Sequence, residues 1–466
     1  MQAEATGAMA MDGRQSPAAS EGRDAVDPWS ISRGTVRRFA GESSLTVVVL
    51  CDHAHVSGGL AQVAHASARA LRRRGHRVVL LAAVPPVAPD LIEAGVEVHC
   101  LEQRDALTEP SRLKAAGRGL WNGAASRRLA AILAPLAESD TVVHVHGWSK
   151  ALSPSVLRSA HRSRAAVVHT LHDYVALCPN GALYDYAKGR NCPLRPMSVR
   201  CVLCDCDARR YGHKLWRVAR QATLIASGGG IAGRDVICIS ERQAEILRPL
   251  LPAGTVMHLV ANPVDAADRG PAEVAANDTF LFVGRLSPEK GPDLLAEAAR
   301  RADLRVVFVG DGPARPAVER ILPGATITGW VGTPEVAGHL RRARALVFPS
   351  RWYETFGLVV QEALANGVPT IVSDNTTSAS MIEHGVTGLL FRSGDTGSLI
   401  EQMRALSDQR TAARIGRQAY DRYWRRPLTL DDHVDRLEEV YRRVLQRRIA
   451  ERREMAAAPS CQESGE

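Results

Sequence analysis

The chain has 466 residues, 45% of them hydrophobic, so it is long enough to bury the cores of two or three domains. It contains no run of about twenty apolar residues, so no membrane-spanning helix is expected. The formal net charge of +9 predicts attraction to anionic partners such as phosphates, nucleic acid or a membrane surface, and it does not choose among them.

The first 43 residues are rich in Ala, Gly, Ser and charged residues and lack the apolar core of a secretory signal. We therefore expect residues 1–43 to form a disordered tail, and we expect a cytoplasmic protein. Nine cysteines in a chain without a secretory signal argue against a disulfide framework.

Strands and helices alternate from residue 44 to residue 264. The apolar run LTVVVL at residues 45–50 is typical of a strand covered on both faces, and a helical pattern follows Gly58 and Gly59 and ends at Gly75. Such a unit implies a parallel sheet. Further strands are expected at residues 78–82, 141–146, 165–170, 235–240 and 255–260. We interpret residues 44–264 as a first domain.

The alternation stops in a polar stretch near residues 262–278 and then starts again. Strands are expected at residues 279–284, 305–310, 345–349 and 369–373, with helices beginning at Pro292, Ala314 and Gly357. The pattern predicts a second domain at residues 265–425, followed by a C-terminal helix and tail at residues 426–466. The fold class is therefore α/β, with two doubly wound Rossmann-like domains that face each other across a cleft. Ligands of such sheets bind beyond the carboxyl ends of the strands.

Two cations follow the first strand of the second domain, in the segment GRLSPEKG at residues 284–291. Arg285 offers a planar fork of donors and Lys290 a point charge, a combination that suits a diphosphate at a strand end. Gly58 and Gly59 lie where the first helix begins, so their amides could approach an anion there. The alternatives are surface cations and a tight turn without a ligand.

Two glutamates follow the strand expected at residues 345–349. Glu354 lies in the loop, and Glu362 lies eight residues further on, in the helix that begins near Gly357. Carboxylates at this edge of a sheet can accept hydrogen bonds from the hydroxyls of a sugar and a ribose. A glutamate near a helix N-terminus is also common for reasons of the helix dipole alone.

The spacing of Glu354 and Glu362, together with GRLSPEKG, GDG at residues 310–312 and ITGWV at residues 327–331, resembles a known family. The chain is similar, over residues 44–425, to the large family 4 of retaining glycosyltransferases, which use sugar nucleotides and have the GT-B fold. The resemblance implies an enzyme of the EC 2.4 class. It would transfer a sugar from a UDP- or GDP-sugar to an acceptor hydroxyl, in glycan, glycolipid or other glycoconjugate biosynthesis, without a catalytic cofactor.

The resemblance also implies roles for individual residues. Arg285 and Lys290 would hold the donor diphosphate, Glu354 the hydroxyls of the transferred sugar, and Glu362 the ribose hydroxyls. The remaining donor contacts would come from Gly58, Gly59, Gly329, Trp330, Val331, Phe356, Gly357 and Leu358. One departure concerns the turn after VSD, where Thr376 and Thr377 stand at positions that the family often fills with glycine.

The histidines follow two expected strands, in HVHGW at residues 144–148 and HTLHDY at residues 169–174. By the same resemblance His172 lies near the reacting sugar, with Asp173 as its orienting partner or an acceptor contact. We group His172 and Asp173 with Glu354 as the catalytic residues, and we assign no nucleophile. A purely structural role is the alternative for each histidine.

Five cysteines lie close together in the segment that follows His172, namely Cys178, Cys192, Cys201, Cys204 and Cys206. One C-x-x-C pair with two outlying thiolates can form a tetrahedral zinc site, so we favour a structural Zn²⁺ within a Cys-rich insertion at residues 178–220. An iron–sulfur cluster and a set of free thiols are the alternatives. Many arginines surround these cysteines and predict a basic face toward an anionic acceptor or the inner face of a membrane.

Two other classes of protein would also explain parts of this sequence. A nucleic-acid-binding zinc protein would explain the cysteines and the charge, but only 5% of residues are aromatic and no RNA-binding motif occurs, so no nucleic acid is expected. A dinucleotide oxidoreductase would need a complete G-x-G-x-x-G fingerprint, which is absent. The one D-x-D sequence, at residues 205–207, lies among the cysteines and implies no catalytic Mg²⁺.

Overall fold

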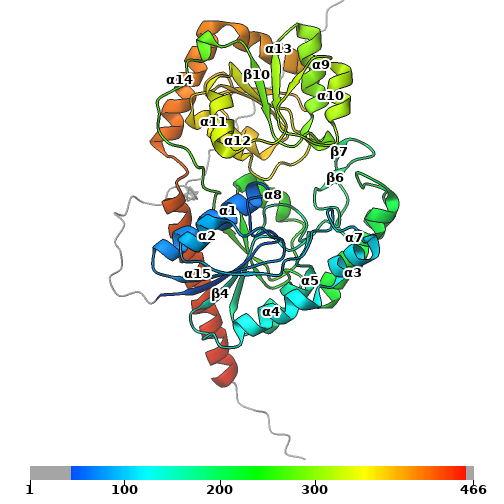
Figure 1. The fold of residues 1–466 in the computed structure, drawn as a ribbon, viewed down its shortest axis with the longest axis vertical. Coiled ribbons are helices and arrows are strands. Elements are labelled where there is room, and N and C mark those ends of the chain that lie inside the picture. The colour runs from blue at the N-terminus through cyan, green and yellow to red at the C-terminus, as the bar shows by residue number, and fades with distance from the viewer. Residues whose placement is uncertain (1–43, 458–466) are drawn as a thin grey trace, which may run out of the picture. The chain divides into compact units, whose positions relative to one another are not determined.

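The structure of the protein is a computed structural model that describes residues 44–457, so the predicted tail at residues 1–43 and Cys461 lie outside the described residues. The first domain contains a seven-stranded parallel sheet (Figure 1). The strand order is β3-β2-β1-β4-β5-β8-β9, and the change of direction lies between β1 and β4. The strands are β1 (Thr46–Leu50), β2 (Arg77–Ala82), β3 (Glu97–Cys100), β4 (Thr141–Val145), β5 (Ala166–Thr170), β8 (Asp235–Cys238) and β9 (Val256–Leu259).

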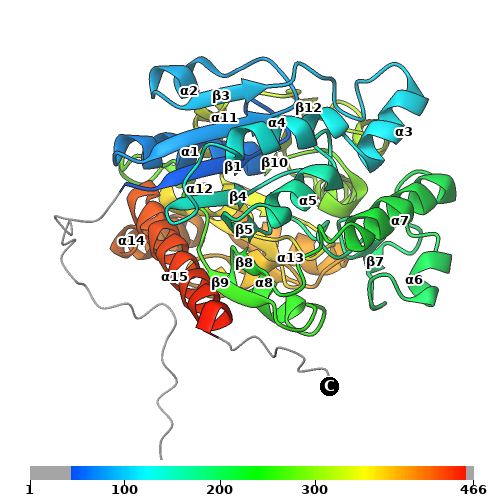
Figure 2. The same ribbon diagram turned by 90° about the horizontal axis from the view of Figure 1, so that it is seen from below.

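Helices cover both faces of this sheet, as Figure 2 shows. They are α1 (Gly59–Arg73), α2 (Pro89–Glu93), α3 (Arg112–Leu120), α4 (Gly123–Leu133), α5 (Pro154–Arg162), α7 (Tyr211–Ala226) and α8 (Glu241–Leu247). The central strands are mostly apolar because side chains on both faces pack against helices; Val47, Val48 and Val49 have no exposed surface.

The second domain repeats this plan with a six-stranded parallel sheet of order β12-β11-β10-β13-β14-β15. Its strands are β10 (Phe280–Val283), β11 (Val306–Val309), β12 (Thr326–Ile327), β13 (Ala345–Phe348), β14 (Thr370–Ser373) and β15 (Leu389–Phe391). Its helices are α9 (Pro292–Ala302), α10 (Arg315–Ile321), α11 (Thr333–Arg341), α12 (Leu358–Ala365), α13 (Thr396–Ser407) and α14 (Gln409–Arg425). Three short 3₁₀ helices complete it, η1 (Val274–Ala276), η2 (Pro288–Lys290) and η3 (Thr377–Met381).

The predicted fold class is confirmed, and each strand expected from the sequence occurs within a residue or two of its predicted bounds. In the two parallel sheets the expectation missed β3, β12 and β15, and it also missed the short β6 and β7 outside them. The first two carry polar or half-buried residues at the edge of a sheet, and β15 has only three residues, so none of them has a long apolar run.

The chain returns to the first domain in its last helix, α15 (Leu430–Ala457). The buried side chains of Val434, Leu437, Tyr441 and Val444 belong to the same apolar core as those of β1 and α1. None of the helices in residues 44–457 is both long and apolar enough to cross a bilayer.

A loop of mixed structure joins β5 to α7 and carries the five clustered cysteines. It contains the antiparallel hairpin of β6 (Tyr184–Asp185) and β7 (Arg190–Asn191), and then the single-turn helix α6 (Val199–Leu203). The backbone N–H of Tyr353, in the second domain, donates to Asn191 Oδ1 at 3.1 Å. The hairpin therefore contacts both domains.

Candidate active site

Polar side chains gather where β1, β4 and β5 end, as the topology of a parallel sheet requires. Asp52 follows β1, and its carboxylate accepts hydrogen bonds from the backbone N–H groups of Lys150, Ala151 and Leu152 at 2.8–3.0 Å. Asp52 therefore fixes the loop after β4 beside His172 and Asp173, with which it lines a small cavity. Asp52 and Lys150 were not among the predicted site residues, because only their positions after apolar strands mark them.

A chain of histidines leads from this cavity into the core. His172 Nε2 lies 2.9 Å from His146 Nδ1, and His146 Nε2 lies 3.2 Å from His144 Nδ1. His144 Nδ1 also lies 2.6 Å from the hydroxyl of Tyr441, on α15. Burial lowers the pKa of His172 to about 3, with a smaller contribution from His433. The imidazole is therefore neutral near pH 7, and its hydrogen bond to His146 requires one ring nitrogen to donate and the other to accept.

Asp173 lies beside His172 but has a different partner. Its carboxylate accepts a hydrogen bond of 2.9 Å from the backbone N–H of Val175, and burial raises its pKa. The ring of His172 is hydrogen-bonded to His146, so the structure shows no contact by which Asp173 would orient it, and the alternative role of Asp173 as an acceptor contact stays a prediction.

In the second domain, Lys290 and Glu354 form an ion pair through Nζ and Oε2. The same carboxylate oxygen accepts hydrogen bonds from Trp352 Nε1 at 2.9 Å and Ser350 Oγ at 3.3 Å. The Lys290 ammonium also lies 5.5 Å from the centre of the Trp352 ring. The two residues that the sequence assigned to neighbouring parts of one donor are thus in direct contact. Arg285 is exposed at the end of β10, and none of the described residues forms a hydrogen bond with its side chain.

The N-termini of α1 and α12, from opposite domains, approach each other. A Cβ atom placed on Gly59 would lie 3.2 Å from Leu358 Cδ1, and the residue before each helix, Gly58 or Gly357, has a positive φ of 148° or 79°. Both helix N-termini present free N–H groups and the positive end of a dipole. Their approach creates a location that favours an anion such as a diphosphate.

Hydroxyl groups support the loop that leads into α12. Thr377 Oγ1 donates to the carbonyl of Glu354, and Ser378 Oγ donates to the carbonyl of Phe356 at 2.9 Å. These residues belong to the turn that departs from the family pattern. The departure is thus compatible with an ordered site, because side-chain hydroxyls fix the backbone on either side of Thr355.

Glu362 lies on α12 with its side chain half-buried. Burial raises the pKa of this carboxyl to about 7, and the negative charge of Asp265 raises it further. Among the described residues no donor hydrogen-bonds to its carboxylate. An unpaired carboxylate in this position can accept hydrogen bonds from hydroxyls of a ligand.

The segment expected to border the base follows β12. Gly329 has a φ of 75° and forms a bridge with Gly310, where a Cβ atom would collide with the carbonyl of Gly284. Three strand ends are therefore packed closely through glycines. Trp330 is 70% exposed, and Val331 is half-buried next to it.

The five cysteines do not form the zinc site that the sequence predicted. Within residues 44–457, no three His, Cys, Asp or Glu side chains are arranged to hold a metal ion. A lysine lies among the sulfurs instead: Lys214, fully buried, donates to Cys206 Sγ at 3.2 Å and to Cys201 Sγ at 3.6 Å. The ammonium group supplies a positive charge from the chain itself.

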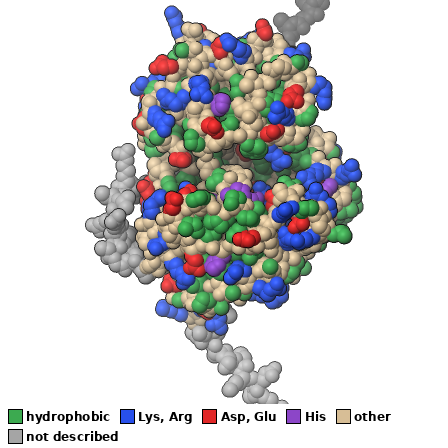
Figure 3. All heavy atoms as spheres, in the orientation of Figure 1, with side chains coloured by type: hydrophobic (Ala, Val, Ile, Leu, Met, Phe, Trp, Pro, Cys, Tyr) green, Lys and Arg blue, Asp and Glu red, His purple; other side chains and the backbone are tan. Residues whose placement is uncertain are grey.

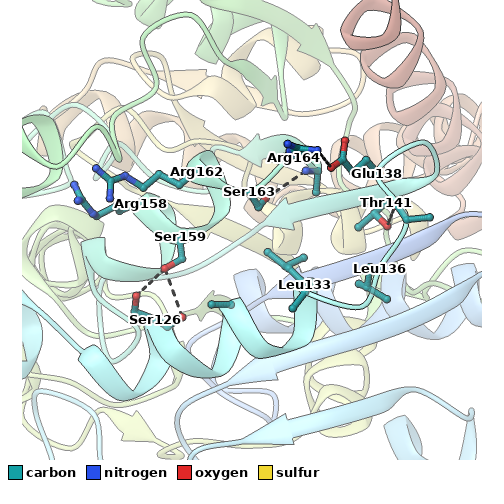
Figure 4. A pocket seen from close by; sticks show the side chains of 14 residues that line it. Ser126, Leu133, Leu136, Glu138, Thr141, Arg158, Ser159, Arg162, Ser163 and Arg164 are labelled. Carbon is teal, nitrogen blue, oxygen red and sulfur yellow. Dashed lines mark hydrogen bonds and ion pairs between the residues drawn. The ribbon is translucent and has the colours of Figure 1, made fainter. Parts of the chain in front are cut away.

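A separate cavity of 510 Å³ lies between α4 and α5, near the start of β4 and β5 (Figure 4). Ser126 and Ser159 are hydrogen-bonded at 2.7 Å on one side of it, and Arg158 and Arg162 lie beside them. The cavity lies at the amino ends of the strands and contains none of the predicted site residues. The cavity at the carboxyl ends, with His172, remains the candidate active site.

Comparison with known proteins identifies the class to which this fold belongs. A sucrose-phosphate synthase from Thermosynechococcus elongatus has the same fold with a TM-score of 0.65 and 19% identity, covering 86% of this chain and 100% of that one. Residues 57–268 match the family described as Glycosyltransferase Family 4, and residues 277–409 match Glycosyl transferases group 1. The protein therefore has the GT-B fold of two Rossmann-like domains.

The chain belongs to the glycosyltransferases that combine these two domain families. A GDP-mannose-dependent alpha-mannosyltransferase from Corynebacterium glutamicum is 41% identical over 109 residues, which cover 23% of this chain and 26% of that protein. A glycogen synthase from Mycobacterium tuberculosis is 26% identical over 388 residues, which cover 77% of this chain and 84% of that protein. The match to the mannosyltransferase spans only 26% of that protein's length.

Proposed function

We propose that the protein transfers a sugar from a UDP- or GDP-sugar to the hydroxyl of an acceptor, with retention of the anomeric configuration. The observation that carries the proposal is the approach of the two helix N-termini beside the Lys290–Glu354 pair, with His172 across the cleft. This combination offers an anion site next to groups that can hydrogen-bond a sugar. The names of the relatives, one of them GDP-mannose-dependent, support a nucleotide sugar as donor.

The diphosphate of the donor would lie between the N-termini of α1 and α12, with Arg285 and Lys290 balancing its charge. Lys290 would exchange part of its contact with Glu354 for the phosphate. Glu354 would then be free to accept hydrogen bonds from the hydroxyls of the sugar. Glu362 would accept those of the ribose, and the backbone of residues 329–331 would border the base.

In the reaction, the bond between the anomeric carbon and the diphosphate oxygen breaks, and the acceptor oxygen forms a bond to the same carbon on the same face. The acceptor proton passes to the departing phosphate oxygen, and the nucleoside diphosphate is the second product. The helix N-termini, Arg285 and Lys290 would stabilise the negative charge that develops on the diphosphate. His172, neutral and half-buried, would hydrogen-bond the sugar beside the reacting carbon.

No catalytic cofactor forms part of this proposal, because the chain's own cations and helix N-termini are sufficient to hold the leaving group. The acceptor is proposed only by class, as a hydroxyl of a glycan, a glycolipid or another glycoconjugate. A peripheral position at the inner face of a membrane would suit a lipid-linked acceptor.

The test measures release of UDP or GDP from UDP-glucose, GDP-mannose and related donors, together with the affinity for the free nucleotides. We expect one nucleotide to bind and its sugar donor to be hydrolysed slowly or transferred. Glu362→Ala should weaken nucleotide binding, whereas Glu401→Ala, an exposed change on α13, should not. Binding of neither nucleotide would contradict the proposal, and NMR of the product's anomeric proton would test retention.

A further inference from the structure

Helix α7 buries polar side chains and exposes apolar ones, which is the reverse of an ordinary surface helix. Its buried residues are Lys214, Arg220, Gln221 and Leu224, three of which are polar. The first turn exposes Gly212 and His213, and beyond it the exposed residues are all apolar, namely Leu215, Ala219, Ala222, Ile225 and Ala226. A surface helix normally has the opposite arrangement, with polar residues outside. From Leu215 onward, the exposed face of α7 therefore lacks the side chains that favour contact with water.

Two neighbouring helices extend this apolar face. On α6, Val199 and Leu203 lie one turn apart and are 75% and 69% exposed, and on α3 Leu113 is 88% exposed. Trp216 Nε1, on α7, donates to a carbonyl of α3 at 3.2 Å, and the Tyr211 hydroxyl donates to a carbonyl of α6 at 3.1 Å. The three helices thus form one end of the first domain (Figure 2). We call this end the α3–α6–α7 surface.

The exposed charged residues around these apolar side chains are mostly cations. Between residues 187 and 226 the exposed cations are Lys188, Arg190, Arg195, Arg200, Arg209 and Arg210, and the one exposed acid among them is Asp205. Six positive charges and one negative charge give this segment a net exposed charge of +5. Asp207, the other acid of this segment, is buried, and so is Asp185 just before it. Cationic and apolar side chains both appear along the corresponding edge of Figure 3.

We propose that the α3–α6–α7 surface seats the protein on an anionic lipid bilayer. Leu113, Val199 and Leu203 would enter the boundary between headgroups and acyl chains, and the arginines would lie among the lipid phosphates. A second copy of this chain fits less well, because a two-fold interface would bring the same cations face to face. The charge also disfavours an ordinary protein partner, since charged residues are depleted from the centres of protein interfaces.

The position of this surface connects it to the candidate active site. The loop that carries α6 begins just after His172, and its hairpin is bonded to Tyr353 through Asn191. A hydroxyl on a membrane-bound lipid could thus approach the cleft from the side of this loop. This consequence for the acceptor rests on the proposed function, whereas lipid binding itself does not.

The test is sedimentation of the full chain with vesicles of phosphatidylcholine alone or of phosphatidylcholine mixed with phosphatidylglycerol. We expect the protein to bind the anionic vesicles at least about 10-fold more tightly, and added salt to weaken that binding. The variant Leu113→Ser/Val199→Ser/Leu203→Ser should lose about 10-fold or more in affinity for the anionic vesicles. Ile92→Ser, which replaces a side chain 57% exposed on α2, is the matched control and should bind as wild type does.

Nucleotide affinity and the thermal melting curve, measured without lipid, separate this proposal from the proposed function and from a folding defect. A triple variant that melts and binds nucleotide normally but no longer sediments supports the surface. Wild-type protein that does not prefer anionic vesicles, or a folded triple variant that binds them undiminished, overturns the proposal. A concentration-dependent dimer that the triple substitution dissociates would identify a second copy as the occupant and would also overturn it.

Discussion

Thr355 Oγ1 donates a hydrogen bond of 2.9 Å to the backbone carbonyl of His172. The bond crosses the cleft, because Thr355 follows β13 in the second domain and His172 follows β5 in the first. Ser240 Oγ, also in the first domain, donates to the carbonyl of Thr355 at 3.0 Å. The loop that carries Glu354 is therefore fixed to the strand end that carries His172.

Removal of this cross-cleft bond should affect turnover. Thr355→Val keeps the shape of the side chain and removes a hydrogen bond that contributes about 1 kcal/mol, so kcat should fall by about 3- to 10-fold. The affinity for free nucleotide should change little. Steady-state kinetics measure the effect, with Thr326→Val, an exposed change on an edge strand, as the control. An unchanged kcat would show that the bond does not align the two halves of the site.

Glu362 should couple stability to pH. Its folded pKa of about 7 lies above the ordinary 4.5, so the ionised form is disfavoured in the fold, and stability is lost as pH rises from about 4.5 to 7. Glu362→Gln should therefore raise the melting temperature at pH 8 and raise it much less at pH 5. The same variant should bind nucleotide about 10-fold more weakly at pH 8, because hydrogen bonds to a charged acceptor are the stronger ones.

Thermal melts at the two pH values and calorimetric titration with UDP and GDP test both effects. Glu401→Gln, at an exposed position, should change neither. A Glu362→Gln variant that binds nucleotide as wild type does would refute the ribose contact. A melting temperature that shifts equally at both pH values would refute the raised pKa.

His172 should act as a neutral group. Because burial holds its pKa near 3, below the ordinary 6.5, the imidazole gains no proton between pH 5 and pH 8. The pH dependence of kcat over this range should therefore contain no step from His172. His172→Asn should lower kcat by about 10²-fold, the usual loss for a transition-state hydrogen bond, and leave nucleotide affinity unchanged, while His99→Asn on an edge strand should have no effect. A His172→Asn variant with wild-type kcat would remove this residue from the site.

Lys290 should contribute to donor binding and to the position of Glu354. Lys290→Ala leaves a buried carboxylate without its cation and removes a phosphate contact, so nucleotide affinity should fall by about 10- to 100-fold. Arg301→Ala, on the exposed side of α9, should leave the affinity unchanged. Titration with UDP and GDP at low and high salt measures the loss. Equal affinities for the Lys290 variant and wild type would place the diphosphate elsewhere.

The position of Lys214 among the cysteines leads to a prediction about the zinc content of the protein. If Lys214 supplies the positive charge there, elemental analysis of purified protein should find no stoichiometric zinc, and a chelator should leave the melting temperature unchanged. Lys214→Met should destabilise the fold by about 1–3 kcal/mol, since two sulfur contacts of a fully buried group are lost. One zinc per chain would contradict this arrangement.

The fold could be predicted because the central strands are short, mostly apolar runs that alternate with helical patterns. The same feature located His172 and Glu354, since the carboxyl ends of parallel strands share one edge. The contacts between individual side chains could not be predicted, because they depend on distances between segments far apart in sequence. The pairing of Lys290 with Glu354 and that of His172 with His146 are examples. The spacing of the cysteines led us to predict a zinc site, because it contains no information about the position of Lys214.

The path of α15 has a consequence for how the protein can be divided. The chain leaves the first domain near residue 264 and comes back at residue 430, so the second domain is topologically an insertion within the first. A truncation after residue 425 would strip Val434, Leu437, Val440, Tyr441, Val444 and Leu445 from the core around β1. At about 1.5–3 kcal/mol for each buried side chain, this loss is comparable to the whole stability of a domain. A fragment of residues 265–425 could be expressed alone, whereas the first domain would need α15 joined back to it.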